Sequence, residues 1–97
     1  MTGSEAVARG RAACERQAWA EAFRELTLAG REIVLEPEDL DRLATAAYLV
    51  GEEAVSAEAR ARAHASFVER GELIRAARSA FWLGYALISE NRRSRWL

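Results

Sequence analysis

The segment Gly51–Leu87, GEEAVSAEARARAHASFVERGELIRAARSAFWLGYAL, decides the fold of this chain. Its two glycines Gly51 and Gly71 are placed to end helices, because glycine readily adopts the left-handed conformation that closes a helix. Residues 57–67 alternate apolar and polar side chains, as a strand would. Most of their apolar members are alanine, which is a strong helix former and a poor strand former. The segment therefore predicts two helices, over about residues 52–70 and 72–90.

Residues upstream of this segment predict three further helices. Apolar residues recur at helical spacing from Trp19 to Ala29, and Gly30 is placed to end that helix. Pro37 suits the first position of the next helix. The break before Trp19, near Gln17, is weakly marked, so residues 4–29 could alternatively form one long helix. We expect a break, which gives helices over about 4–16, 18–29 and 37–50.

Length and composition predict one small helical domain and exclude several other classes. Ninety-seven residues suffice for a single domain, residues 1–97. One cysteine excludes an internal disulfide and fits a reducing compartment, so we expect a cytoplasmic protein. No apolar run reaches membrane length, and the N-terminal residues show no signal-peptide core, so we expect no secretory leader. The net charge is −1, and all 14 basic residues are arginine, with no basic stripe before Arg92. Nucleic-acid binding by this segment is therefore not expected.

The chain resembles a tetratricopeptide repeat array, in which helix-turn-helix units recur with a period of about 34 residues. Residues at the family's spacing fall into three units, which are Gly10, Ala22, Leu26 and Ala29, then Leu40, Leu43, Ala44, Ala47, Gly51 and Ala63, and then Ala80, Leu83, Gly84 and Leu87. Arg9, Ser56 and Arg60 depart from the pattern, and the connector at 31–36 is long. The resemblance implies an all-α fold of antiparallel helix-turn-helix repeats, with about five helices and a partial sixth.

The run from Tyr48 to Leu87 is also similar to the N-terminal helical-repeat region of actinobacterial LuxR-type transcriptional regulators. The similarity rests on a leucine and glycine at a helix end, an Ala/Arg/Glu-rich helix, a glycine, and then RAAR-A-WL from Arg75 to Leu83. In that family a C-terminal helix-turn-helix contacts DNA, and no such segment is present here. The resemblance implies a regulatory module for protein–protein interaction, whose partner is another protein or an adjacent repeat.

The residues that could support catalysis or metal binding are too few and too far apart. A catalytic histidine needs a serine and an acid at its two ring nitrogens. Ser66 lies two positions from His64 on one predicted helix, so its side chain points in another direction. Zinc needs about four ligands, and His64 with Cys14 does not supply them. Cys14 suits a small apolar filler. We therefore expect a non-enzymatic protein with no cofactor and no metal.

Aromatic and arginine residues near the C-terminal end are the candidate binding site. In repeat proteins the concave face binds ligands, and aromatic side chains with arginine are enriched at interface hot spots. If the repeat geometry holds, five residues fall toward that face, namely Tyr48, Arg78, Phe81, Tyr85 and Ile88. The alternative is that the aromatic residues are part of the core.

The last predicted helix becomes apolar on nearly every side, so it must be covered on more than one side. We therefore predict a self-association edge formed by Trp82, Trp96 and Leu97. This edge would contact the next repeat if the chain is a fragment of a longer array. In the isolated chain it would pair two copies in a homodimer.

Two alternatives of other classes remain open. A small nucleic-acid-binding domain would contact phosphates through the C-terminal arginines, which are Arg92, Arg93 and Arg95. A ligand-sensing domain would hold a small molecule between helices, near Trp19, Phe23 and residues 81–85.

Overall fold

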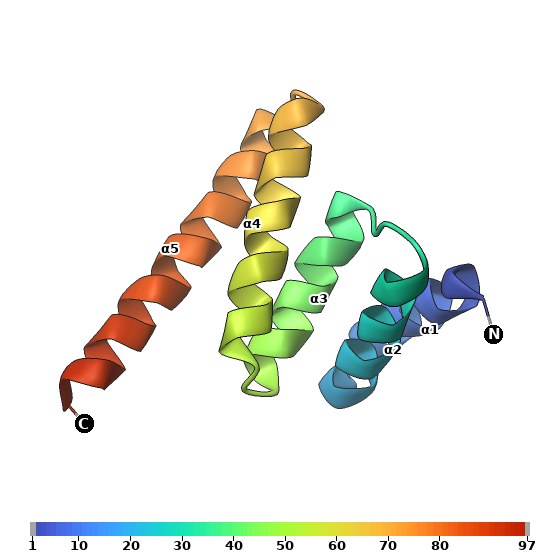
Figure 1. Ribbon diagram of the computed structural model, residues 1–97, viewed down its shortest axis with the longest axis horizontal. Coiled ribbons are helices and arrows are strands. Elements are labelled where there is room, and N and C mark those ends of the chain that lie inside the picture. Colours follow the sequence, from blue (N-terminus) through green and yellow to red (C-terminus); the bar gives the residue numbers. More distant parts are fainter. Residues whose placement is uncertain (1, 97) are drawn as a thin grey trace.

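The computed structural model describes residues 2–96, with side chains described for residues 2–85 and 88. Over these residues the chain forms five helices and no strand, as Figure 1 shows. The helices are α1 (Gly3–Glu15), α2 (Trp19–Glu32), α3 (Pro37–Leu49), α4 (Glu53–Glu69) and α5 (Leu73–Trp96). The prediction of an all-α fold is therefore confirmed, and the five full helices that the sequence predicts are all present.

The helices form an array of antiparallel helix-turn-helix repeats. Helix α3 begins 34 residues after α1, and α4 begins 34 residues after α2. Helices α3 and α5 run in the same direction, and α4 lies between them and runs the opposite way (Figure 1). Helices α1 and α5 lie at opposite ends of the array (Figure 1). Helix α5 is thus the first helix of a third repeat.

Three turns close helices with the same hydrogen-bond pattern. After α3, the N–H of Glu52 donates to the carbonyl of Ala47 at 2.8 Å, and the N–H of Gly51 donates to the carbonyl of Tyr48 at 3.2 Å. This is a Schellman motif, which needs a left-handed residue after the helix. Gly51 supplies it with φ of 89°, and Gly71 supplies it after α4 with φ of 74°.

The turn after α1 repeats this pattern with glutamine in place of glycine. Gln17 has φ of 60°, and its N–H donates to the carbonyl of Cys14 at 3.0 Å. The N–H of Ala18 donates to the carbonyl of Ala13 at 2.9 Å. Residues 4–29 therefore form two helices, and the break that the sequence marks only weakly is a complete Schellman motif.

Two predicted boundaries are wrong. Gly30 does not end a helix, because α2 continues to Glu32 and the chain then becomes extended at Ile33, with φ of −136°. Residues 91–96 do not begin a sixth helix but continue α5 as far as Trp96. The connector that follows α2 buries Leu35 against the core and leaves Val34 87% exposed, so only part of it packs on the core.

The core lies between the helix pairs and depends on small residues for close approach. A Cβ atom on Gly10 would lie 2.6 Å from Cγ of Leu26, so glycine lets α1 and α2 approach closely. The main cluster of buried residues spans all five helices and comprises Ala6, Val7, Leu26, Ala29, Leu35, Leu40, Leu43, Ala44, Ala59, Ala63, Phe67 and Ala76. Half of these residues are alanine, so the six larger members, which are Val7, four leucines and Phe67, supply most of the buried apolar area.

Candidate functional site: a groove over α3, α4 and α5

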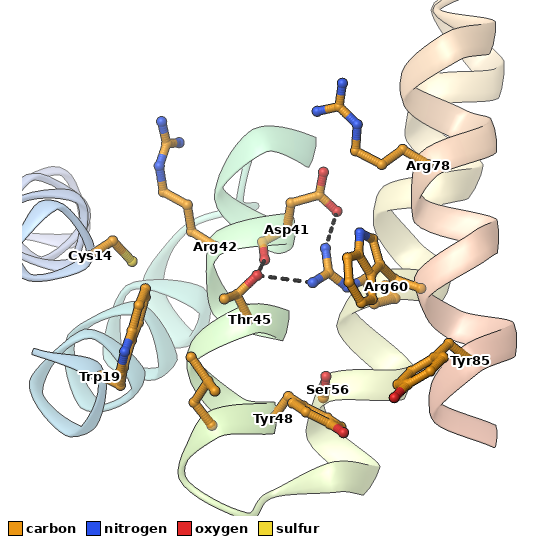
Figure 2. A pocket seen from close by; sticks show the side chains of 12 residues that line it. Cys14, Trp19, Asp41, Arg42, Thr45, Tyr48, Ser56, Arg60, Arg78 and Tyr85 are labelled. Carbon is orange, nitrogen blue, oxygen red and sulfur yellow. Dashed lines mark hydrogen bonds and ion pairs between the residues drawn. The ribbon is translucent and has the colours of Figure 1, made fainter. Parts of the chain in front are cut away.

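A cavity of about 530 Å³ lies on the face that α3 and α5 share, with α4 at its base (Figure 2). Helix α3 contributes the most side chains to it, and α5 forms the opposite wall. The lining residues are Cys14, Trp19, Asp41, Arg42, Thr45, Tyr48, Leu49, Ser56, Arg60, Arg78, Trp82 and Tyr85. We call this cavity the groove.

A polar network joins the three helices beneath the groove. Asp41 Oδ1 accepts hydrogen bonds from Arg60 Nη1 and from Ser79 Oγ, each at 3.1 Å. Arg60 Nη2 donates to Thr45 Oγ1 at 2.9 Å. The Ser79 side chain is buried, so its hydrogen bond to Asp41 offsets the cost of removing its hydroxyl from water. The network therefore connects α5 to α3 and α4. It also engages the Asp41 carboxylate, which faces the groove, in hydrogen bonds within the chain.

The groove has an arginine end and an aromatic end. Along α3, Arg42 precedes Tyr48, and along α5, Arg78 precedes Tyr85. Because the two helices run in the same direction, Arg42 and Arg78 lie towards one end and the two tyrosines towards the other, as Figure 2 shows. The two arginines occupy equivalent positions of successive repeats, since α5 begins 36 residues after α3 and Arg78 follows Arg42 at the same interval.

The two arginines differ in their pairing. Arg42 Nη1 donates to Asp39 Oδ1 at 2.9 Å, and Asp39 also accepts two hydrogen bonds from Arg11, at 2.8 Å and 2.7 Å. Arg78 is exposed and has no carboxylate within ion-pair distance among the described side chains. Of the two cations at this end, Arg78 is the one available to an occupant.

The Asp39 carboxylate fastens the first repeat to the second. It is 1% exposed at the start of α3, and Arg11 reaches it from α1. Burial acts to raise the pKa of Asp39, but the hydrogen bonds and charges of Arg11 and Arg42 outweigh burial and lower its pKa overall. The carboxylate is therefore charged at neutral pH and ties α1 to α3.

The aromatic end exposes its rings to solvent. Trp82 makes edge-to-face contacts with Phe81, at 5.5 Å between ring centroids, and with Tyr85, at 6.0 Å. Trp82 and Tyr85 are 45% and 51% exposed, and Tyr48 on α3 is exposed as well. These aromatic residues are therefore not part of the core, which was the alternative that the sequence left open.

The structure brings together three of the five residues predicted for a groove. Tyr48, Arg78 and Tyr85 line the cavity, whereas Phe81 and Ile88 do not and are exposed on α5. Trp82, which the sequence assigns to a self-association edge, lines the groove instead. The other two edge residues, Trp96 and Leu97, fall outside the described side chains.

Sequence reasoning missed much of the arginine end. Arg42, Arg60 and Asp41 all contribute to the groove or its base, yet none of them is among the site residues predicted from the sequence. Comparing successive repeats could have found part of it, because Arg42 and Arg78 are 36 residues apart. The position of Arg60 was noticed only as a departure from the repeat pattern.

The remaining candidate residues have structural surroundings. His64 Nδ1 lies 2.7 Å from the backbone carbonyl of Ala76 and donates to it, which connects α4 to α5. Burial raises the pKa of the Cys14 thiol, which favours the unreactive protonated form. Within residues 2–85 and 88, no cluster of His, Cys, Asp or Glu could hold a metal ion. Over the described residues, no helix combines the length and apolarity needed to cross a membrane.

Comparison with known proteins adds no relative to this picture. No family model, curated protein or solved structure matches the chain. The class of protein is thus defined by the fold and the groove alone, as an all-α helical-repeat domain with an amphipathic concave site.

Proposed function

We propose that this chain is a non-enzymatic protein–protein interaction module that binds a segment of a partner protein in the groove. The observation that carries the proposal is a hollow on the repeat face lined by exposed tyrosine, tryptophan and arginine. These residue types are enriched at interface hot spots. Helical-repeat proteins use such concave faces for binding.

The exposure of the rings supports binding rather than a structural role. An aromatic side chain that stabilises a small domain is normally covered, yet Trp82 and Tyr85 remain about half exposed beside each other. Covering rings of this size removes a large apolar area from water, which favours association. A partner segment in the groove would supply that cover.

The regulatory context is the second part of the proposal. The repeat length of 34 residues supports a likeness to tetratricopeptide repeats, whose units have about this length. The sequence similarity to the helical-repeat region of LuxR-type regulators suggests that the module transmits a signal within a transcriptional regulator. Adjacent repeats or a second copy would then contact α5.

The test compares the proteins retained by three immobilised forms of the chain. The double variant Tyr48→Ala/Trp82→Ala removes two rings from the groove, and Val34→Ala is the control because Val34 is exposed on the distant connector. We expect the wild type and the control to retain the same partner from a cell extract and the double variant to lose it. If all three retain the same proteins, the groove is not the binding site.

A small-molecule site is the second candidate, favoured by the cavity volume. Ligand pockets commonly measure about 300–1,000 Å³, and the groove, at about 530 Å³, lies within that range. A ligand that binds only the folded state raises the melting temperature. A metabolite that does so for the wild type but not for Trp82→Ala would favour this candidate over a protein partner.

A further inference from the structure

The polarity of the groove specifies the chemistry of its occupant. We infer that the groove binds a peptide segment in which a block of acidic residues adjoins a block of apolar or aromatic residues. This inference rests on the proposed function and adds to it the sign of the partner's charge and the grouping of its residues into blocks.

The charge of the groove is the first step. Three arginines and one aspartate line it, whereas the whole chain has a net charge of −1. The aspartate, Asp41, already accepts hydrogen bonds from Arg60 and Ser79, so it is engaged in the base of the groove. A local positive site on a chain of slight negative charge attracts carboxylates and disfavours cations.

Among the described side chains, the guanidinium of Arg78 is free to pair with an occupant, which is the second step. Its guanidinium extends from α5 over the groove (Figure 2), and no described carboxylate lies within ion-pair distance of it. Arginine presents a planar set of donors that matches a carboxylate. Arg42 lies at the same end, although Asp39 holds it. Binding a carboxylate at Arg78 would therefore complete a pairing that the chain itself does not provide.

The separation of charge from rings is the third step. Arg42 precedes Tyr48 along α3 and Arg78 precedes Tyr85 along α5, so these arginines and tyrosines lie towards opposite ends of the groove, with Arg60 between them (Figure 2). An occupant that satisfies both ends at once must carry its carboxylates and its apolar side chains in separate blocks. A peptide in which the two kinds of residue alternate could satisfy only one end at a time.

The test is selection from a phage-displayed library of random peptides on the immobilised full chain. We expect enriched peptides to contain Asp or Glu in a block beside Trp, Phe or Leu. Binding of a synthetic copy of an enriched peptide should weaken about tenfold or more in Arg78→Glu, since attraction is replaced by repulsion. It should also weaken as salt is added.

The matched control is Arg24→Glu, which makes the same charge change at an exposed arginine on α2, outside the groove. This control should leave the affinity nearly unchanged. A scrambled peptide that alternates the same acidic and apolar residues should bind more weakly than the block sequence.

The outcomes separate this inference from the proposed function. Enriched peptides that are neutral or basic, and that need Trp82 but not Arg78, would leave the peptide groove standing and overturn the acidic occupant. Acidic peptides that bind Arg78→Glu as tightly as the wild type would also overturn it. If no peptide is enriched, or if the enriched peptides bind Tyr48→Ala/Trp82→Ala unchanged, both proposals fail.

Discussion

Gln17 occupies a position at which the two later turns have glycine. Its φ of 60° lies in the left-handed region, which costs a residue with a side chain roughly 1–2 kcal/mol relative to the right-handed region. Replacing it by glycine removes this strain but adds freedom to the unfolded chain. We expect Gln17→Gly to raise the free energy of unfolding by about 0.5–1 kcal/mol in urea titrations. The reverse change Gly71→Gln should lower it, and a loss of stability in Gln17→Gly would contradict the argument.

Asp39 adds buried ion pairs to the apolar packing that joins the first two repeats. Removing its carboxylate leaves Arg11 and Arg42 without the partner that both contact. Breaking a buried ion pair typically costs about 3–5 kcal/mol, and both arginines here are partly exposed, so we expect Asp39→Ala to cost about 2–3 kcal/mol. Chemical denaturation measures the difference. Glu58→Ala, on the exposed face of α4, is the control and should change stability by less than about 0.5 kcal/mol.

The Asp39 carboxylate should also make the free energy of unfolding depend on pH. The pKa of Asp39 is lower in the folded chain than in the unfolded chain, where it is about 3.9. Its contribution is therefore fully present above the unfolded pKa and is lost as the pH falls through the folded pKa. We expect the unfolding free energy of the wild type to fall more steeply below about pH 4 than that of Asp39→Asn. Parallel curves for the two proteins would show that Asp39 does not contribute in this way.

At the scale of the element, two glycines inside helices should respond oppositely to alanine. A Cβ on Gly30 would lie 3.5 Å from Leu35, an ordinary contact, whereas one on Gly10 would lie 2.6 Å from Leu26. Alanine is favoured over glycine by about 1 kcal/mol inside a helix. We expect Gly30→Ala to stabilise the chain by up to that amount, and Gly10→Ala to destabilise it because α1 and α2 must separate. Thermal melts of the two variants test this, and equal shifts would contradict the packing argument.

The helices were predictable because their signals are local. Gly51, Gly71 and Pro37 mark boundaries that the structure confirms within one or two residues. The break at Gln17 was predicted correctly but from the repeat pattern, because glutamine itself carries no turn signal. The prediction that Gly30 ends a helix was wrong for the opposite reason. Glycine is a common helix end, but it is tolerated inside a helix when the following residues continue that helix.

At the scale of the whole molecule, the outer face of α5 should control self-association. Ile74, Phe81 and Ile88 recur at seven-residue intervals and are 82%, 65% and 62% exposed. Exposed apolar faces favour pairing with a second copy. We expect light scattering over a concentration series to show a dimer that dissociates on dilution. The double variant Phe81→Glu/Ile88→Glu should be monomeric, and a wild type that is monomeric at every concentration would contradict the prediction.

The groove was only partly predictable, because it depends on which face of α5 packs against α4. The sequence placed five residues on one concave face by the period of the repeat. In the structure, α5 buries Ala76 and Ser79, which turns Trp82 towards the groove and Phe81 away from it. The arginine end could not be predicted from the sequence, because its side chains come from different helices. The partners of Asp39 and Asp41 lie 3 to 38 residues from them in sequence.

The position of α5 determines how binding in the groove would change the local stability of the chain. Helix contacts in this array are mainly between neighbours along the chain, and α5 packs mainly on α4. In such arrays an end helix can open while the rest stays folded. One wall of the groove is therefore the helix with the fewest neighbours. A bound segment that contacts both α3 and α5 would keep α5 packed against the array. Its binding should therefore slow amide hydrogen exchange in residues 73–85.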